Sequence, residues 1–213
     1  LHVIKLPFRR VTEILLFMKR MYRVNDIFFS LQGEGRNSGI AAVFIRFSGC
    51  NLKCSFCDTD FSEYKEMTLE NIIDNVKQLT DECEGSEKPL IVLTGGEPTL
   101  QVDEQLISAF HDEGYKVAME SNGTKEPPAN LDWFTVSPKT DVKVKKCNEL
   151  KCIFDERMHV DTFGIEADYY YLQPCDTGNL MRNSEITTIC IEYIKRHPKW
   201  RLSLQTHKLI GFK

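Results

Sequence analysis

Short apolar segments alternate with polar or glycine-containing turns along most of the chain. Seven of them resemble strands in length and in apolar, β-branched and aromatic content: residues 42–47, 90–93, 116–119, 133–136, 149–154, 169–172 and 201–204. The second of these, Leu-Ile-Val-Leu, is apolar at every position, which predicts a strand buried on both faces.

Three other segments have apolar side chains at helical spacing. In residues 69–79 these side chains fall on one face, and Thr68 can cap the start of the helix. Residues 103–113 and 186–194 are the other expected helices. The order strand, turn, helix, strand predicts a parallel sheet with crossover helices.

The length of the chain limits the fold that such a sheet can form. The chain has 213 residues, whereas a closed eight-stranded βα barrel needs about 250. Some connections, such as residues 123–132, are too short to contain a helix. We therefore predict an α/β fold, a partial (open) βα barrel with fewer helices than strands. Its polar strand ends would meet at the edge where such barrels bind ligands.

The first 20 residues differ from the rest. They are basic and lack the long apolar stretch and small-residue cleavage site of a signal peptide, and Met21 would be a natural start. We expect residues 1–20 to be a non-native or disordered extension, with an amphipathic helix as the alternative. Residues 21–213 should form a single domain, since domains usually hold about 100–200 residues.

Composition and charge argue against several classes of protein. The net charge of −4 is unlike that of a broad nucleic-acid-binding surface, which would be basic. No run of about 18 apolar residues is present, so no membrane span is expected. The 42% apolar content is ordinary for a globular protein, and we expect a cytoplasmic one.

The eight cysteines are unevenly distributed. Cys50, Cys54 and Cys57 lie close together, whereas the other five are scattered. Clustered thiols in a reducing compartment indicate metal binding or catalysis rather than disulfides. Three thiolates can hold three irons of a 4Fe–4S cluster and leave the fourth iron open for another ligand, which is a catalytic arrangement.

Two other interpretations of these cysteines remain open. A structural zinc site needs four ligands, which Cys54 and Cys57 could form with Cys147 and Cys152, but Cys50 would then have no role. The thiols could also be buried without any ligand. The spacing favours the cluster.

The spacing C-x3-C-x2-C, with Phe56 before the last cysteine, resembles the radical S-adenosylmethionine (SAM) superfamily. The resemblance implies that the open iron binds SAM, which is cleaved to a 5′-deoxyadenosyl radical that removes hydrogen from a substrate. It assigns SAM contacts to the cysteine loop, the glycine pair and other strand ends: Phe56, Asp58, Gly95, Gly96, Glu97, Ser121, Ser137, Pro138, Lys139, Gln173, Pro174, Cys175 and Asp176. The polar residues among them could instead only cap strand ends.

More specific motifs narrow the family. Leu31-Gln-Gly-Glu-Gly35, an arginine four residues before the first cysteine, Cys57-Asp-Thr59 and the tail at 202–211 closely resemble the 7-carboxy-7-deazaguanine synthases of queuosine and 7-deazapurine biosynthesis. The resemblance covers residues 21–213. It implies a carbon–nitrogen lyase that converts 6-carboxy-5,6,7,8-tetrahydropterin to 7-carboxy-7-deazaguanine, releases ammonia, regenerates SAM and needs Mg²⁺.

The residue types suit this substrate. Arg46 can bind the pterin carboxylate through two hydrogen bonds, and the stretch from Gln32 to Glu34 can accept hydrogen bonds from the guanidine-like edge. Thr59 offers an oxygen to Mg²⁺. With contacts added by resemblance, the predicted substrate site comprises Leu31, Gln32, Gly33, Glu34, Arg46, Thr94, His207 and Lys213. His207 could equally be a structural residue at the end of the last strand.

The resemblance also implies a homodimer and an electron donor such as flavodoxin or ferredoxin, with no nucleic-acid or membrane partner. Two rival functions stay open. A glycyl-radical activating enzyme would share the cysteine triad and the glycine pair but would not explain Gln32 or Thr59. A zinc-binding module would contain neither iron nor sulfide.

Overall fold

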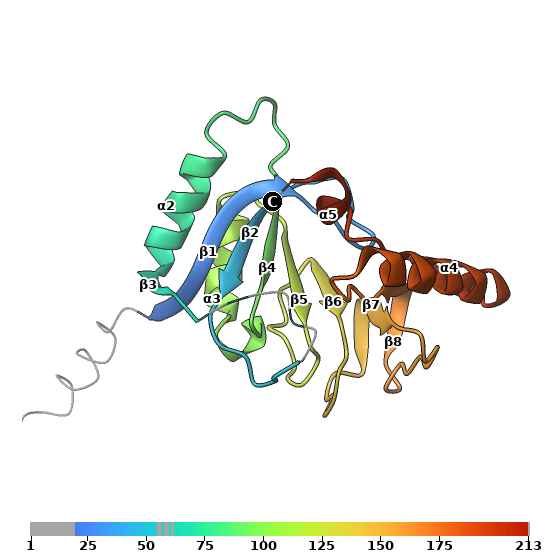
Figure 1. Ribbon diagram of the computed structural model, residues 1–213. Helices are drawn as coiled ribbons and strands as arrows, with labels where there is room; N and C mark the ends of the chain where they lie inside the picture. Colours follow the sequence, from blue (N-terminus) through green and yellow to red (C-terminus); the bar gives the residue numbers. More distant parts are fainter. Residues whose placement is uncertain (1–19, 55–56, 58–59, 61, 213) are drawn as a thin grey trace, which may run out of the picture.

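The computed structural model describes residues 20–54, 57, 60 and 62–212. Their strands form one open sheet in the order β3-β1-β2-β4-β5-β6-β7-β8-β9 (Figure 1). The bounds are β1 (Met21–Leu31), β2 (Ala41–Phe47), β3 (Lys65–Thr68), β4 (Leu90–Gly95), β5 (Val117–Ser121), β6 (Trp133–Val136), β7 (Lys146–Phe154), β8 (Glu166–Pro174) and β9 (Trp200–Leu202). Neighbours among β2 and β4 to β9 pair in parallel, which confirms the predicted partial βα barrel.

Two strands were not expected from the sequence. β1 pairs antiparallel with both β2 and β3. Only Tyr22, Val24 and Phe28 are buried along β1, and β3 is a four-residue strand with no buried residue. Such strands have weak sequence signals, because pairing with their neighbours stabilises them more than their own residues do.

The described residues form five helical segments. These are α2 (Leu69–Leu79), the 3-10 helix η1 (Pro98–Leu100), α3 (Glu104–Asp112), α4 (Leu180–Arg196) and α5 (Thr206–Ile210). None of these helices is both long and apolar enough to cross a membrane. The predicted cap is confirmed, since Thr68 Oγ1 accepts a hydrogen bond from Asn71 N at 3.2 Å.

One helix prediction and one strand prediction need correction. α4 begins at Leu180 rather than Ile186, because the Asn179 side chain caps its first turn by accepting a hydrogen bond from Arg182 N at 3.1 Å. The last strand spans Trp200–Leu202 rather than residues 201–204. The residues expected as the polar end of that strand lie instead at the start of α5, which spans Thr206–Ile210. His207 therefore lies on a helix and not at a strand end.

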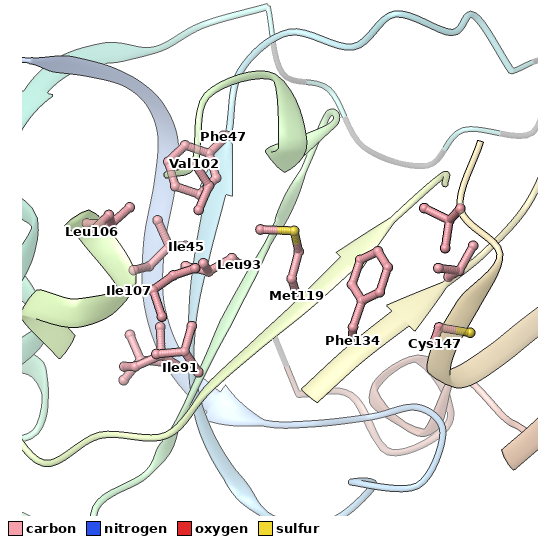
Figure 2. Packing of buried hydrophobic residues seen from close by; sticks show 14 of the residues in the cluster. Ile45, Phe47, Ile91, Leu93, Val102, Leu106, Ile107, Met119, Phe134 and Cys147 are labelled. Carbon is pink, nitrogen blue, oxygen red and sulfur yellow. The ribbon is translucent and has the colours of Figure 1, made fainter. Parts of the chain in front are cut away.

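The main core lies on the outer face of the sheet, where Ile45, Ile91 and Leu93 cluster with Leu106 and Ile107 of α3 (Figure 2). All five are fully buried. Each such side chain contributes about 1.5–3 kcal/mol by leaving water. These contacts fix the strands on which the site is built.

A smaller apolar cluster lies on the opposite, inner face of the same strands, so the prediction that residues 90–93 are buried on both faces is confirmed. Alternate residues of a strand share a face. On the inner face the side chains change from apolar to polar towards the carboxyl ends of the strands. In chain order they are Ala42, Phe44 and Arg46 in β2, Leu90, Val92 and Thr94 in β4, and Ala118 and Glu120 in β5. The polar positions therefore gather at one edge of the sheet.

Candidate active site

A cavity of about 790 Å³ opens at the carboxyl edge of the parallel strands. This volume lies within the range of roughly 300–1,000 Å³ that is typical of small-molecule sites. The cavity is lined by most of the residues predicted from the sequence: Leu31, Gln32, Gly33, Glu34, Arg46, Cys50, Cys54, Cys57, Thr94, Gly95, Gly96, Ser121, Ser137, Lys139, Gln173, Pro174, Cys175, Asp176 and His207.

Some predicted site residues are not among them. Phe56, Asp58, Thr59 and Lys213 lie outside the described residues. Glu97 and Pro138 are described but do not line the cavity. The roles predicted for all six residues stay predictions.

The three clustered cysteines follow β2 and face the same cavity. Leu52 N donates a hydrogen bond to Cys50 Sγ at 3.4 Å, and burial raises the pKa of the Cys50 thiol. In the described residues no three His, Cys, Asp or Glu side chains form a preassembled metal site. Three thiols at one cavity nevertheless fit a 4Fe–4S cluster, because they supply three ligands and leave room for a fourth from a cofactor.

The four-cysteine zinc interpretation finds no support in the geometry. Cys147 and Cys152 are buried in the main core cluster, away from the lining of the cavity. Burial raises the pKa of each thiol to about 12. They pack as small apolar residues and leave Cys54 and Cys57 to the cavity.

The glycine pair after β4 allows a close contact with the start of the cysteine loop. Gly96 N donates to Phe47 O at 2.8 Å, and Glu97 N donates to Gly49 O at 2.9 Å. A Cβ atom at Gly95 would lie 2.4 Å from Phe47 N, and one at Gly96 would lie 2.1 Å from Gly49 O. Neither position has room for a side chain, so the glycines set the position of the cysteine loop.

Glu97 is completely buried and ties the ends of β4 and β5 together. Its carboxylate accepts hydrogen bonds from Thr99 N at 3.0 Å, Ser121 Oγ at 2.8 Å and Asn122 N at 2.8 Å. The Asn122 side chain in turn donates to Asn51 Oδ1 at 3.0 Å, within the cysteine loop. Glu97 therefore does not line the cavity itself but holds Ser121 and Asn122, which do.

The Gln-Gly-Glu-Gly loop after β1 crosses the open side of the barrel and contacts the last elements of the chain. Gly33 O accepts hydrogen bonds from Thr206 N at 3.2 Å and Thr206 Oγ1 at 2.8 Å, and Gly35 N donates to Ser203 Oγ at 3.0 Å. A Cβ at Gly33 would lie 2.6 Å from His207 Nδ1. We call these contacts between residues 32–36 and 203–207 the clasp.

Next to the clasp, Glu34 belongs to an ion-pair network with Lys151 and Glu120, two residues that were not predicted from the sequence. Lys151, on β7, pairs with Glu34 and, at 3.4 Å, with Glu120 of β5. Burial acts to raise the pKa of Glu34, but the Lys151 ammonium and a 3.0 Å hydrogen bond from Gln205 outweigh it and hold that pKa below its usual value. The available signal was the pair of charged residues Glu149 and Lys151, which alternate along β7 and so share one face of the strand.

Arg46 and Thr94 are paired on the neighbouring strands β2 and β4. The Arg46 guanidinium lies over the Phe28 ring, 5.0 Å from its centre, and Phe28 stacks on Phe44. All four residues line the cavity. The arrangement presents a planar cation next to an apolar ring stack, which suits a flat anionic ligand.

The loops after β6 and β8 complete the rim. Lys139 Nζ donates to Ser137 Oγ at 2.7 Å, and burial lowers the pKa of Lys139 to about 8. Asp176 pairs with Lys208 of α5 at 2.9 Å, and hydrogen bonds, above all the one from Lys208, hold the pKa of Asp176 far below its usual value. This ion pair ties the β8 loop to the same helix as the clasp.

Comparisons with known proteins agree with this geometry. The model of the radical SAM superfamily matches residues 44–158. The chain is 44% identical to the 7-carboxy-7-deazaguanine synthase of Bacteroides thetaiotaomicron, over 91% of this chain and 100% of that protein. It is 42% identical to the synthase of Caulobacter vibrioides, over 89% and 98%. A crystal structure of QueE from Escherichia coli superposes with a TM-score of 0.68 at 25% identity, over 86% of this chain and 93% of that one. The chain therefore belongs to the 7-carboxy-7-deazaguanine synthase family of the radical SAM superfamily.

Proposed function

We propose that the chain is a radical SAM lyase that converts 6-carboxy-5,6,7,8-tetrahydropterin to 7-carboxy-7-deazaguanine with loss of ammonia, as a step of queuosine and 7-deazapurine biosynthesis. The proposal rests above all on one observation: the cysteine triad, Arg46 and Glu34 line the same cavity. Family membership supports the same reaction.

Arg46 and Glu34 would orient the substrate by its two chemically different ends. The Arg46 guanidinium would bind the carboxylate, while Gln32 and Glu34 accept hydrogen bonds from the guanidine-like edge. Thr94 lies beside Arg46 in the sheet and would contact the same ring. Holding the substrate in one orientation selects the hydrogen atom that is removed.

The cofactor half of the site would be formed by the cysteine loop and the strand ends. A 4Fe–4S cluster held by Cys50, Cys54 and Cys57 would supply the electron that cleaves SAM to the radical that removes hydrogen from the substrate. The glycine pair Gly95–Gly96, Ser121, residues 137–139 and residues 173–176 would orient SAM. Glu97, which was predicted to contact SAM, would also hold Ser121 and Asn122 in place.

Three further features complete the proposal. Thr59 would provide an oxygen to Mg²⁺, which suits a small hard cation that also takes substrate oxygens. Flavodoxin or ferredoxin would deliver the electron. The enzyme would work in the cytoplasm as a homodimer.

Anaerobic turnover tests the proposed function. After cluster reconstitution, the protein would be mixed with reductant, SAM, Mg²⁺ and 6-carboxytetrahydropterin, and 7-carboxy-7-deazaguanine would be sought by mass. We expect product with little net loss of SAM. Reductive cleavage of SAM without this product would contradict the substrate, and protein that holds zinc in place of iron and sulfide would contradict the cluster.

A further inference from the structure

A buried lysine lies among three carboxylates, two of which, Glu34 and Glu120, line the cavity, and the chemistry proposed so far gives this lysine no role. Lys151 is 4% exposed and pairs with Glu34 and Glu120. Glu149 is 3% exposed and accepts a hydrogen bond from Arg36 N at 2.9 Å. The four side chains come from the loop after β1, from β5 and from β7, so only the folded barrel brings them together.

Buried carboxylates keep their charge only when something compensates for the lost water. For Glu149 the compensation is too small, because burial raises its pKa more than the hydrogen bond from Arg36 N and the Lys151 charge lower it. Glu34 shows the opposite, because Lys151 and Gln205 outweigh burial and lower its pKa. The Lys151 ammonium, which pairs with Glu34, is therefore a main reason why Glu34 keeps its charge.

Among the described residues, two further ionisable side chains face this cluster. Lys139, from the segment between β6 and β7, and His207, on α5, both act on it electrostatically. Lys139 donates to Ser137 at the rim, and His207 packs against Gly33. The direct ion pairs to Glu34 and Glu120 come from Lys151.

We propose that Lys151 is a positioning residue for the substrate, which holds Glu34 and Glu120 in place as two carboxylates that accept hydrogen bonds from the N–H edge of the pterin. The inference rests on the function proposed above. Gln32 belongs to the same frame, because its Nε2 donates to Glu120 Oε1 at 2.9 Å. Lys151 acts through the two glutamates and needs no contact with the substrate.

The chemistry of the pterin edge explains why the charge matters. That edge offers an amino group and a ring N–H, which are both donors, and carboxylates are acceptors only. A protonated carboxyl would bring its own O–H towards these donors and leave buried groups unpaired, which is costly. Glu34, Glu120 and Lys151 all line the cavity, so the two carboxylates are accessible to a ligand.

The test compares Lys151→Met with the matched control Lys146→Met, which lies on the same strand but is exposed. In the reconstituted full-length enzyme we expect Lys151→Met to raise the KM for 6-carboxytetrahydropterin about ten- to a hundredfold, with a much smaller change in kcat. The control should match the wild type. Reductive cleavage of SAM without substrate should persist in both variants, which shows that they fold and bind SAM.

A pH series separates the effect of charge from a loss of packing. Without the ammonium, burial raises the pKa of Glu34, so the fraction of Glu34 in the carboxylate form falls as the pH falls. The KM ratio of Lys151→Met to wild type should therefore grow as the pH is lowered from about 9 to about 6. Lys151→Arg keeps the charge, and its ratio should stay constant across the same range.

Two results would overturn the inference. The first is a KM for Lys151→Met equal to that of the control Lys146→Met, and the second is a KM ratio of Lys151→Met to wild type that does not change with pH. If Lys151→Met does not fold, the double variant Lys151→Met/Glu120→Gln, which has the wild-type net charge, replaces it and is compared with Glu120→Gln alone. A KM above that of Glu120→Gln supports the inference, and an equal KM overturns it. Wild-type enzyme that cleaves SAM but makes no 7-carboxy-7-deazaguanine would instead refute the proposed function, and this inference with it.

Discussion

Arg46 and Glu34 present opposite charges to one cavity. Arg46 lies on β2 over the Phe28 ring, and Glu34 lies in the loop after β1, where it forms an ion pair with Lys151. A ligand with a carboxylate at one end and N–H donors at the other can be oriented by these two residues alone. Their separate roles can therefore be tested at the scale of single side chains.

Replacement of Arg46 by alanine should impair substrate binding without removing the cofactor chemistry. We expect kcat/KM for 6-carboxytetrahydropterin to fall about ten- to a hundredfold or more, because a charged hydrogen-bonding group is lost. Steady-state kinetics would measure this fall, and reductive SAM cleavage should persist. Arg157→Ala, at an exposed arginine outside the cavity lining, is the control. Unchanged substrate kinetics for Arg46→Ala would remove it from the site.

At the scale of elements, the clasp joins the beginning of the sheet to its end. β1 lies near one edge of the open sheet and β9 at the other. The loop after β1 nevertheless meets Ser203 and Thr206 through hydrogen bonds. This contact closes the cavity on the side where the barrel has no strand, and it places Glu34 over Lys151.

Thr206→Val should weaken the clasp, because the hydroxyl donor to Gly33 O is lost while the side chain keeps its shape. We expect a loss of about 0.5–1.5 kcal/mol in the free energy of unfolding and a KM raised several-fold. Denaturant unfolding and substrate kinetics measure the two effects. Thr188→Val is the control, since Thr188 Oγ1 makes a similar 2.9 Å bond to Ser184 O on the exposed side of α4. Equal effects of the two variants on KM would contradict a role for the clasp in binding.

At the scale of the whole molecule, the charge of Glu34 links the stability of the barrel to pH. The pKa of Glu34 is lowered in the folded protein from its ordinary value of 4.5. A lowered pKa contributes stability that is fully present above the ordinary value and is lost as the pH falls through the folded one. Glu34 should therefore stabilise the fold at neutral pH and cease to do so in acid.

Comparison of the wild type with Glu34→Gln isolates this contribution, because the other carboxyl groups titrate in both proteins. We expect the difference in unfolding free energy to be largest near neutral pH and to shrink as the pH falls below about 4.5. Urea unfolding along a pH series is the measurement. A difference that stays constant down to the most acidic folded sample would show that Glu34 is not held as a carboxylate by Lys151.

Local patterns were sufficient for most of the fold. The apolar run of Leu90 to Leu93, the helical spacing of residues 69–79 and the Thr68 cap each depend on neighbours in the chain, and the structure has all three. The cysteine loop and the glycine pair were also visible, because their spacing is itself the signal. The structure added the reason for Gly96, which is a backbone contact with Gly49.

The sequence by itself determined the strands and helices with strong periodicity, the partial barrel and the polar strand ends at one edge, because these follow from local spacing and chain length. Only the tertiary structure decided the antiparallel β1, the helix at residues 206–210 and the Lys151 network with Glu34 and Glu120. Glu34 and Lys151 are 117 residues apart in the chain. No local pattern reports such a pair, because its charge state depends on burial and on partners that folding alone brings within reach.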